Sequence, residues 1–347
     1  MAVKLKDIAK ASGVSISTVS RILNRDASRK SSDETSRRVI DIARELGYMS
    51  EAPAKIEMLN GASERPTYSI GCILTSEHES FVSPFFSTLL AGIQNELTRT
   101  GSQLKYKFFV MNFRDRGFAQ FIESTHLDCG IMLGRTSLEN ITLLRERIPN
   151  LVYAGVNNIG NDFDEVICDG YSGAVSAVSY LAGLGHRRIG YIGSTQQKYQ
   201  VFNEHRYQGF LDALKSSSLK VDDEFVVDTP LTSADGYESM LSLVRRKSLP
   251  TAIFCGNDTV ALGVMRALNE NDISIPGDIS IMGFDNIDTA SYVKPALTTI
   301  SVPMQDLGRL AVKVMLDRLE TGRDYAIRVN LPFRLIERAS CRAIVDA

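Results

Sequence analysis

The sequence predicts an α/β protein that begins with a small all-α unit. From Tyr68 onward, short apolar runs alternate with amphipathic stretches of helical periodicity, which is typical of a parallel sheet covered by helices. Residues 5–25, LKDIAKASGVSISTVSRILNR, differ because they indicate two short helices joined by a tight turn. With 347 residues and 44% hydrophobic content, the chain can bury a large core in about two or three domains.

The first helix is predicted from Leu5 to about Ala11. Leu5, Ile8 and Ala9 lie on one side of it, at the three-and-four spacing of a buried face. Ser12-Gly13-Val14 then turns the chain, because glycine tolerates the left-handed backbone that a sharp turn requires. Val14 is expected to fill the angle between the two helices.

The second helix is predicted to begin at Ser15, whose hydroxyl can accept a hydrogen bond from an amide of the first turn. Val19, Ile22 and Leu23 form its apolar side. In a recognition helix, the side opposite the apolar one enters the major groove of DNA. A helical hairpin packed in an ordinary protein core would show the same spacing of apolar residues. The outward residues are Ile16, Ser17, Ser20 and Arg21.

Net charge separates these two alternatives. Residues 1–49 contain ten Lys or Arg and six Asp or Glu, a net charge of +4, whereas the whole chain carries −2. The basic excess lies where contacts with DNA phosphates are needed. The sequence therefore favours nucleic-acid binding by this unit.

Each outward side chain suits a different contact with DNA. Arg21 can bond guanine O6 and N7 with both arms of its fork, Ile16 can pack on a thymine methyl group, and Ser17 can tune a neighbouring position. Arg29 lies in the loop RDASRKSS, where it either reaches a phosphate or belongs to a solvated charged loop. The predicted phosphate contacts are Ser15, Thr18, Ser20 and Asn24.

The remaining elements follow from the apolar periodicity. A third helix is predicted after the cap Ser32 or Asp33, with a buried stripe of Val39, Ile42, Ala43 and Leu46. The predicted strands are YSIGCILT, LKYKFFVMN, CGIMLG, LVYAGV, DEVICDG, RRIGYIGS, AIFCGN and ISIMGFD. The predicted helices of this part are residues 85–99, 138–147, 171–184, 205–216, 235–246, 259–271 and 304–320.

Polar residues that follow predicted strands are candidates for a ligand site, because ligands of open α/β sheets bind beyond the carboxyl ends of strands. Asn257 and Asp258 follow AIFCG, Asp285 follows ISIMGF, and Arg206 opens the helix after RRIGYIGS. Arg, Asn and Asp supply the paired donors and acceptors that a polyol needs. A helix cap is an equally good role for Asn257 and the favoured one for Asp258, and Asp285 suits a turn cap.

Six segments resemble the lactose-repressor/galactose-repressor family of bacterial transcription regulators. They are distributed along the chain, so that the resemblance covers nearly its full length. They occur in the order found in that family. The segments are LKDIAKASGVSISTVSRILN, YLAGLGHRRIGYIGS, HRYQGFLDAL, PTAIFCGNDTVALGVMRAL, IPGDISIMGFDN and PALTTISVP.

The resemblance implies a helix-turn-helix headpiece and a periplasmic-binding-protein-like body of two doubly wound parallel-sheet subdomains. Three chain crossings join the subdomains, and we expect them near Ile167-Cys168, Lys294-Pro295 and Asn330-Leu331. The implied divisions are a headpiece of residues 1–49, a hinge and linker of 50–66, an N-terminal effector subdomain of 67–167 plus 295–330, and a C-terminal effector subdomain of 168–294 plus 331–347.

In the family, the segment after the headpiece becomes a hinge helix on operator DNA and inserts an apolar side chain into the minor groove. This chain departs from the family pattern, because Ser50-Glu51 replaces the usual Pro-Asn and Glu57 stands where a leucine is expected. Either a shifted register offers Ile56, Met58 or Leu59 as the inserted side chain, or the operator is bent less.

By resemblance, Arg206, Asn257 and Asp285 contact a small-molecule effector from the C-terminal subdomain. Phe85 and Phe86 in SPFF resemble an aromatic pair that stacks on a sugar ring, and they suit the core of their own helix equally well.

Arg135, after CGIMLG, is a further candidate for the ligand site. Arg135 and Arg206 in one cleft would favour an anionic or phosphorylated effector, unless Asp169 or Asp285 pairs with either charge.

The sequence therefore predicts a homodimeric repressor, of carbohydrate-utilisation genes by family analogy, whose affinity for a roughly palindromic operator changes when a sugar or sugar phosphate binds. We expect the helix of residues 85–99 and the segment after RRIGYIGS at the dimer surface. The chain has no leucine-rich tail after IERASC, which favours a dimer over a tetramer. A sugar-binding protein without DNA regulation is the alternative, but that class needs an export signal in place of a basic headpiece.

Other classes lack support in the sequence. We find no GxSxG, HExxH or P-loop motif, and we expect neither catalysis nor a cofactor. The five scattered cysteines indicate buried thiols, and the four histidines lack metal-ligand spacing. Without an export signal or an apolar run of membrane-spanning length, the expected location is the cytoplasm.

Overall fold

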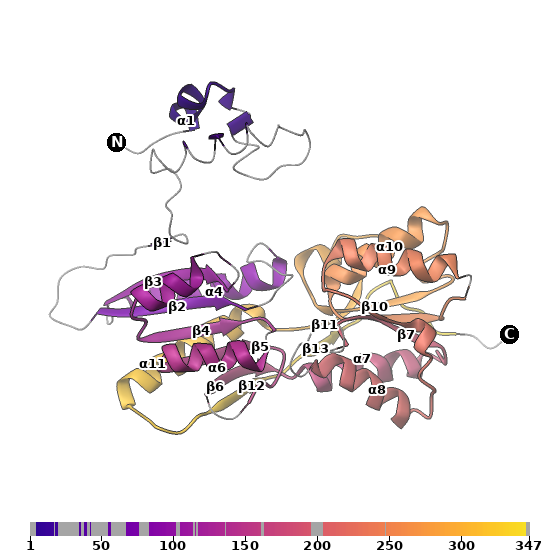
Figure 1. Ribbon diagram of the computed structural model, residues 1–347. Helices are drawn as coiled ribbons and strands as arrows, with labels where there is room; N and C mark the ends of the chain where they lie inside the picture. The colour runs from indigo at the N-terminus through magenta and orange to yellow at the C-terminus, as the bar shows by residue number, and fades with distance from the viewer. Residues whose placement is uncertain are drawn as a thin grey trace. The chain divides into compact units, whose positions relative to one another are not determined.

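The chain forms two compact units, residues 1–56 and residues 57–347, the second of which is called the body below. Their structure is given by a computed structural model (Figure 1). It describes residues 5–16, 18–19, 35, 38–39, 42, 55–56, 67–75, 83–101, 105–113, 115, 117–135, 137–160, 163–195, 204–246 and 248–344.

The first unit begins with α1 (Leu5–Ser12), and the turn after it has the predicted geometry. Gly13 has a φ of 68°, in the left-handed region that glycine adopts without strain. Ile8, Ala9, Val19 and Val39 form a small buried core, against which Val14 and Ile42 pack. The predicted apolar faces are thus confirmed at these positions, whereas Ile22, Leu23, Ala43 and Leu46 lie outside the described residues. The unit also contains the two-residue strand β1 (Lys55–Ile56).

The first half of the body is built on a parallel sheet whose strands follow the order β3-β2-β4-β5-β6-β12. Alternate residues of β2 enter two cores: Cys72 packs with the face that α4 and α11 cover, and Ile73 packs with the face that α5 and α6 cover. The strands are β2 (Thr67–Leu74), β3 (Lys105–Asn112), β4 (Cys129–Leu133), β5 (Asn150–Gly155), β6 (Asp164–Cys168) and β12 (Arg328–Leu331). The helices are α4 (Pro84–Thr100), α5 (Phe118–Ser124), α6 (Leu138–Arg147) and α11 (Met304–Thr321).

The second half is a similar layered structure around the order β13-β11-β10-β9-β7-β8, in which only β13 runs antiparallel to its neighbour. The helices α7 and α8 cover one face, and α9 and α10 cover the other (Figure 1). The strands are β7 (Ile189–Gly193), β8 (Val226–Asp228), β9 (Ala252–Cys255), β10 (Ser280–Asp285), β11 (Thr298–Ser301) and β13 (Arg334–Ile336). The helices are α7 (Gly170–Gly183), α8 (His205–Ser216), α9 (Ser233–Arg245) and α10 (Asp258–Glu270), with 3-10 turns at Asp223–Phe225 and Asp288–Ser291.

The chain passes between the two halves three times, after β6, after β11 and between β12 and β13 (Figure 1). The first and third crossings lie next to the predicted positions. The second differs from the crossing predicted near Lys294-Pro295, because Thr298 pairs in parallel with Met282 of β10 and the chain stays in the second sheet to Ser301. The run TTIS is short and mostly buried, and as β11 it lies between β10 and β13 in the second sheet.

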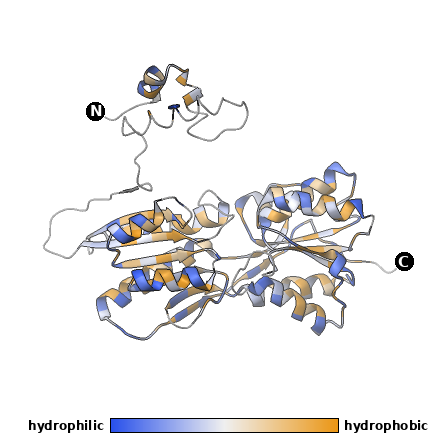
Figure 2. Ribbon diagram, in the orientation of Figure 1, coloured by the Kyte–Doolittle hydropathy of each residue, from blue (hydrophilic) through white to orange (hydrophobic). Residues whose placement is uncertain are grey.

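Apolar residues follow the strands and the inward helix faces, and polar residues follow the outer helix faces (Figure 2). All five cysteines are free thiols; the predicted burial is confirmed for four of them, whereas Cys341 is partly exposed. Burial raises the pKa of Cys341 to about 11, so that this partly exposed thiol is also protonated at neutral pH.

Candidate functional site

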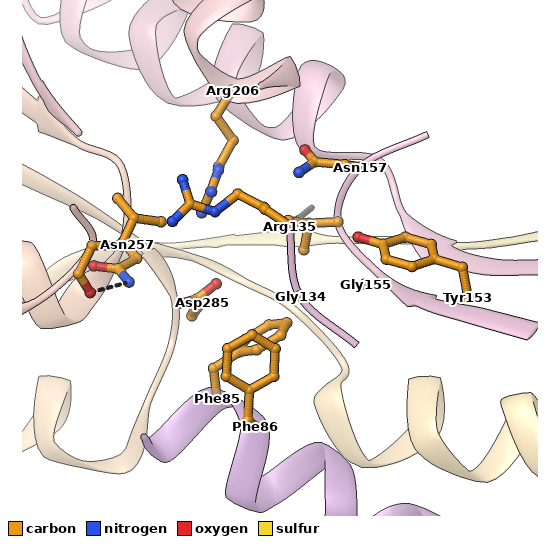
Figure 3. Close-up of a pocket in the computed structure, with 12 residues that line it drawn as sticks. Phe85, Phe86, Gly134, Arg135, Tyr153, Gly155, Asn157, Arg206, Asn257 and Asp285 are labelled. Atoms are coloured by element: carbon orange, nitrogen blue, oxygen red, sulfur yellow. Dashed lines mark hydrogen bonds between the residues drawn. The ribbon is translucent and has the colours of Figure 1, made fainter. Parts of the chain in front are cut away.

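A pocket lies where strands of both halves end (Figure 3). The first half contributes the start of α4 and the ends of β4 and β5, and the second half contributes the start of α8 and the ends of β9 and β10. All six residues proposed from the sequence as ligand contacts line it. They are Phe85, Phe86, Arg135, Arg206, Asn257 and Asp285.

The aromatic pair forms one wall of the pocket and also belongs to the core. Phe85 and Phe86 stand edge to face, with ring centroids 5.1 Å apart. Phe86 is buried in the main core cluster, and Phe85 is partly exposed against that cluster. The rings therefore pack in the core and also line the pocket (Figure 3).

Arg206 is buried and held in a fixed orientation. Its Nη1 donates to the carbonyl oxygen of Gly256 at 2.6 Å, and its Cζ lies 5.6 Å from the centroid of the Phe284 ring. Its Nε and Nη2 donate to Oε1 and Oε2 of Glu204, at 2.8 and 3.1 Å. The bidentate pairing leaves little freedom for the guanidinium plane.

Glu204 connects the two arginines of the pocket across the two halves of the body. Nη1 of Arg135, which follows β4, lies 3.3 Å from Oε2 of Glu204, which precedes α8. Glu204 has 0% exposure. The sequence suggested Asp169 or Asp285 as partners of these arginines, but Asp169 instead caps α7 by accepting from the amide of Ser172 at 3.1 Å.

Electrostatics keep this cluster ionised. Burial by itself raises the pKa of Glu204, but the charges of Arg206 and Arg135 outweigh burial and hold the pKa below its ordinary value. Burial alone would lower the pKa of Arg206, yet the attraction and hydrogen bonds of Glu204 raise it. The carboxylate and the guanidinium therefore stabilise one another's charged forms.

Asn257 has the cap role that the sequence offered for it, and it also lies at the pocket wall. It is the N-cap of α10, since its Oδ1 accepts from the amide of Val260 at 2.8 Å, and it lines the pocket. Its Nδ2 donates to the carbonyl oxygen of Leu231 at 3.3 Å, the bond drawn in Figure 3. The cap fixes the amide at the pocket wall.

The cap role predicted for Asp258 is wrong. Its Oδ2 accepts from the amide of Ile287 at 2.8 Å and its Oδ1 from the hydroxyl of Thr299 at 2.6 Å. Burial raises the pKa of Asp258 to about 7, although these two hydrogen bonds to its carboxylate act to lower the pKa. The side chain thus fastens β11 and the loop after β10, because the fold turns it inward from the helix start.

The backbone bends sharply behind Asp285, the last residue of β10. Asp285 has a φ of 117° and Asn286 a φ of 60°, values that side-chain-bearing residues rarely adopt. Asp285 lines the pocket, beside the aromatic pair in Figure 3. Backbone strain of this kind is concentrated at functional sites in proteins.

Sequence reasoning missed Glu204, Tyr153 and Asn157. Asn157 is the second residue after the end of β5, so the expectation that ligand contacts follow strand ends would have found it. Tyr153 sits within β5, and its hydroxyl points toward the pocket (Figure 3). Glu204 was missed because it follows no predicted strand and one of its partners, Arg135, is 69 residues away in the sequence. Asn157 is buried, and its Oδ1 accepts no hydrogen bond from any described residue.

In the headpiece, the described part of the second helix has the predicted start. The amide of Thr18 donates to Oγ of Ser15 at 3.2 Å, and the two hydroxyls lie 2.9 Å apart. Ile16 is 52% exposed, which agrees with an outward position. Ile56 lies in β1, and its side chain is not described. Ser17, Ser20, Arg21, Asn24 and Arg29 lie outside the described residues.

A helix-turn-helix core joined to an α/β body, with a pocket where strands of the two halves of the body end, defines the class of DNA-binding regulators that carry a small-molecule domain. Comparison with known proteins agrees with this class. Residues 4–51 match the description "Bacterial regulatory proteins, lacI family", and residues 178–341 match the description "Periplasmic binding protein-like domain".

Curated relatives match along nearly the whole chain. The HTH-type transcriptional repressor MelR of Bacillus subtilis is 32% identical over 98% of this chain and 97% of its own length. The HTH-type transcriptional repressor PurR of Pectobacterium atrosepticum is 32% identical over 97% of this chain and 96% of its own. A LacI family transcriptional regulator from Enterococcus faecium, solved with bound ribose, is 28% identical with a TM-score of 0.69 and covers 80% of this chain and 100% of that one.

The chain belongs to the lacI family of bacterial regulatory proteins, as a helix-turn-helix transcriptional regulator. The relatives named here are repressors and not enzymes. None of the helices in the described ranges is both long and apolar enough to cross a membrane. Within those ranges, no three His, Cys, Asp or Glu side chains are grouped to hold a metal ion.

Proposed function

We propose that this regulator is a homodimeric repressor whose DNA affinity changes when a small, sugar-like effector binds in the pocket. The observation that carries the proposal is the convergence of the six side chains chosen from the sequence, which come from both halves of the body, around one pocket. Aromatic faces beside Arg, Asn and Asp groups suit a ring that bears several hydroxyls. The ribose bound to the Enterococcus faecium protein supports the same class of ligand.

The position of the pocket supports a mechanism for coupling. A ligand there contacts both halves, and it therefore stabilises the arrangement of the halves that it fits best. We assign residues 67–168 and 302–331 to one subdomain and residues 169–301 and 332–347 to the other, so that every strand stays with its own sheet. Coupling of about 1–3 kcal/mol would change DNA affinity by roughly 5- to 150-fold, and DNA would change effector affinity by the same factor.

The headpiece residues keep the roles inferred from the sequence. Arg21 would be the main reader of base edges, with Ile16 and Ser17 beside it, and Ile56 would act at the hinge. A dimer that uses the exposed surface of α4 would present two headpieces to the halves of a palindromic site. Carbohydrate-utilisation genes are the proposed targets and the cytoplasm is the proposed location; we assign no catalytic role.

A ligand screen followed by a DNA-binding assay tests the proposal. Purified protein is screened by thermal shift against neutral sugars and sugar phosphates, and compounds that stabilise it are added to a DNA-binding titration. We expect at least one sugar to stabilise the wild type and to change DNA affinity, and we expect Arg206→Ala to lose both effects. The control Arg266→Ala removes an arginine exposed on α10, outside the pocket, and should behave as the wild type. Unchanged stabilisation in Arg206→Ala would show that the ligand binds elsewhere.

The alternative, a sugar-binding protein without DNA regulation, makes a different prediction. Its affinity for duplex DNA would be weak and nearly independent of salt, whereas a DNA-binding headpiece loses affinity steeply as salt is raised.

A further inference from the structure

We propose that Glu204 is a positioning residue that sets the charge selectivity of the pocket, so that the site accepts uncharged, hydroxyl-bearing ligands and rejects anionic ones. This inference rests on the proposed role of the pocket as the effector site. It concerns a residue outside the pocket wall that acts through the two arginines.

Arg135 and Arg206 would by themselves make an anion site. They enter the pocket from opposite halves of the body, and their side chains extend toward one another (Figure 3). Guanidinium groups bind phosphate and carboxylate through pairs of parallel N–H donors. Two such groups in one pocket would favour a phosphorylated ligand.

Glu204 removes this preference by occupying the donors. Its carboxylate accepts hydrogen bonds from Nε and Nη2 of Arg206, which form the edge of the guanidinium that would otherwise bind a phosphate. Nη1 of Arg206 donates to the carbonyl oxygen of Gly256. The same carboxylate lies 3.3 Å from Nη1 of Arg135. A phosphate would have to displace a fully buried carboxylate from both arginines.

The charges also balance. Arg135 and Arg206 contribute two positive charges, and Glu204 and Asp285 contribute two negative charges, with Asp285 itself at the pocket wall. The pocket therefore has no net charge to attract an anion. An anion that enters it loses its hydration without compensation, because charge interactions are strong where water is excluded.

The remaining polar groups favour a ligand that donates hydrogen bonds. Oδ1 of Asn157 is a buried acceptor without a partner among the described residues, and the carboxylate of Asp285 can only accept when ionised. Sugar hydroxyls can donate to both groups, whereas the dianionic phosphate group of a sugar phosphate has no proton to donate. Phe85 and Phe86 complete the site with apolar surface.

Phosphate binding by the full-length chain tests the proposal. The unfolding midpoint of the wild type and of Glu204→Gln is measured in inorganic phosphate and in chloride of equal ionic strength. D-ribose and D-ribose 5-phosphate are then compared as a pair that differs only by the phosphate group. We expect Glu204→Gln to raise affinity for the anionic probes at least tenfold, because it frees the arginines and leaves the pocket with a net positive charge. Adding Arg206→Ala to this variant should abolish the gain.

Three further variants separate charge from packing. Glu204→Asp keeps the carboxylate and should keep the selectivity of the wild type. Glu270→Gln removes the exposed carboxylate that pairs with Arg266 on α10, and it should gain nothing. Asp285→Asn removes one negative charge from the same pocket and should also gain anion affinity, so the test holds even where Glu204→Gln fails to fold.

The proposal is wrong if Glu204→Gln or Asp285→Asn folds and phosphate shifts its unfolding midpoint no more than it shifts that of the wild type. It is equally overturned where the wild type already binds phosphate through Arg206. If the proposed function is wrong, sugars do not alter DNA affinity. The two failures can be told apart, because phosphate binding is measured without DNA.

Discussion

Arg135 and Glu204 form a 3.3 Å ion pair that links the end of β4 in the first half of the body to the start of α8 in the second. Both side chains are nearly or fully buried, and Glu204 is shared with Arg206. The contact therefore joins the two halves beside the pocket, and the residues involved can be tested one at a time.

The two ends of this ion pair should contribute unequally to stability. Glu204→Ala leaves two buried guanidinium groups without their shared carboxylate, and we expect the free energy of unfolding to fall by about 3–5 kcal/mol. Arg135→Ala leaves Glu204 paired with Arg206 and should cost only about 1–2 kcal/mol. Urea unfolding measures both, with the surface variant Glu270→Ala, expected within about 0.5 kcal/mol of the wild type, as the control. Equal costs for the two buried variants would contradict the shared pairing.

A second contact between the halves should make stability depend on pH. The amide of Asn158 donates to Nδ1 of His205 at 3.3 Å, which requires a neutral imidazole. Burial lowers the pKa of His205 below 6.5, although the nearby Glu204, Asp169 and Glu165 oppose this and Arg328 assists it. The folded state therefore binds fewer protons than the unfolded chain, and its stability falls as pH decreases below about 6.5.

Replacement of this histidine tests the pH dependence. In His205→Gln, the loss of stability between pH 6.5 and 5 should become shallower by up to ~1.4 kcal/mol per pH unit, the effect of one proton. Denaturant titrations at several pH values give this slope, and the exposed His126→Gln serves as the control. An unchanged slope in His205→Gln would mean that its protonation is not linked to folding.

The fold was largely predictable because its signals are local. All eight predicted strands exist, and the predicted bounds of α6 and α8 agree with those observed. The strands β8, β11, β12 and β13 were missed, since they have three or four residues and are defined by their pairing. The helix α5 was missed for a similar reason, because it has seven residues and only Phe118 of them is buried.

In the candidate site, too, residues marked by local sequence signals were found and residues defined by distant contacts were missed. Arg206, Asn257 and Asp285 were found because each stands at the end of a strand or the start of a helix, where chain order alone gives the position. Glu204 was missed, because its importance comes from Arg135, which is 69 residues away in the sequence. The role of Asp258 was misjudged, since only the bend after β10 brings Ile287 to its carboxylate.

The packing of α4 on α11 should tolerate no added methyl group at its closest point. A Cβ at Gly92 would clash with the backbone carbonyl oxygen of Gln305. We expect Gly92→Ala to lower the free energy of unfolding by about 1–3 kcal/mol, the usual cost of overpacking. Gly183→Ala, at the end of α7 with open space around its Cα, should leave stability unchanged or raise it by up to about 1 kcal/mol. Thermal and urea unfolding of both variants provide the comparison.

Selection of DNA sites from a random duplex library is the most direct test of the central claim that the headpiece reads sequence. For the wild type, we predict enrichment of one roughly palindromic site. Arg21→Ala should reduce discrimination at one position of each half-site by about 1–3 kcal/mol, and it should leave the body folded. A wild-type protein that enriches no sequence, or an Arg21→Ala variant that enriches the same site with the same preference, would contradict the account.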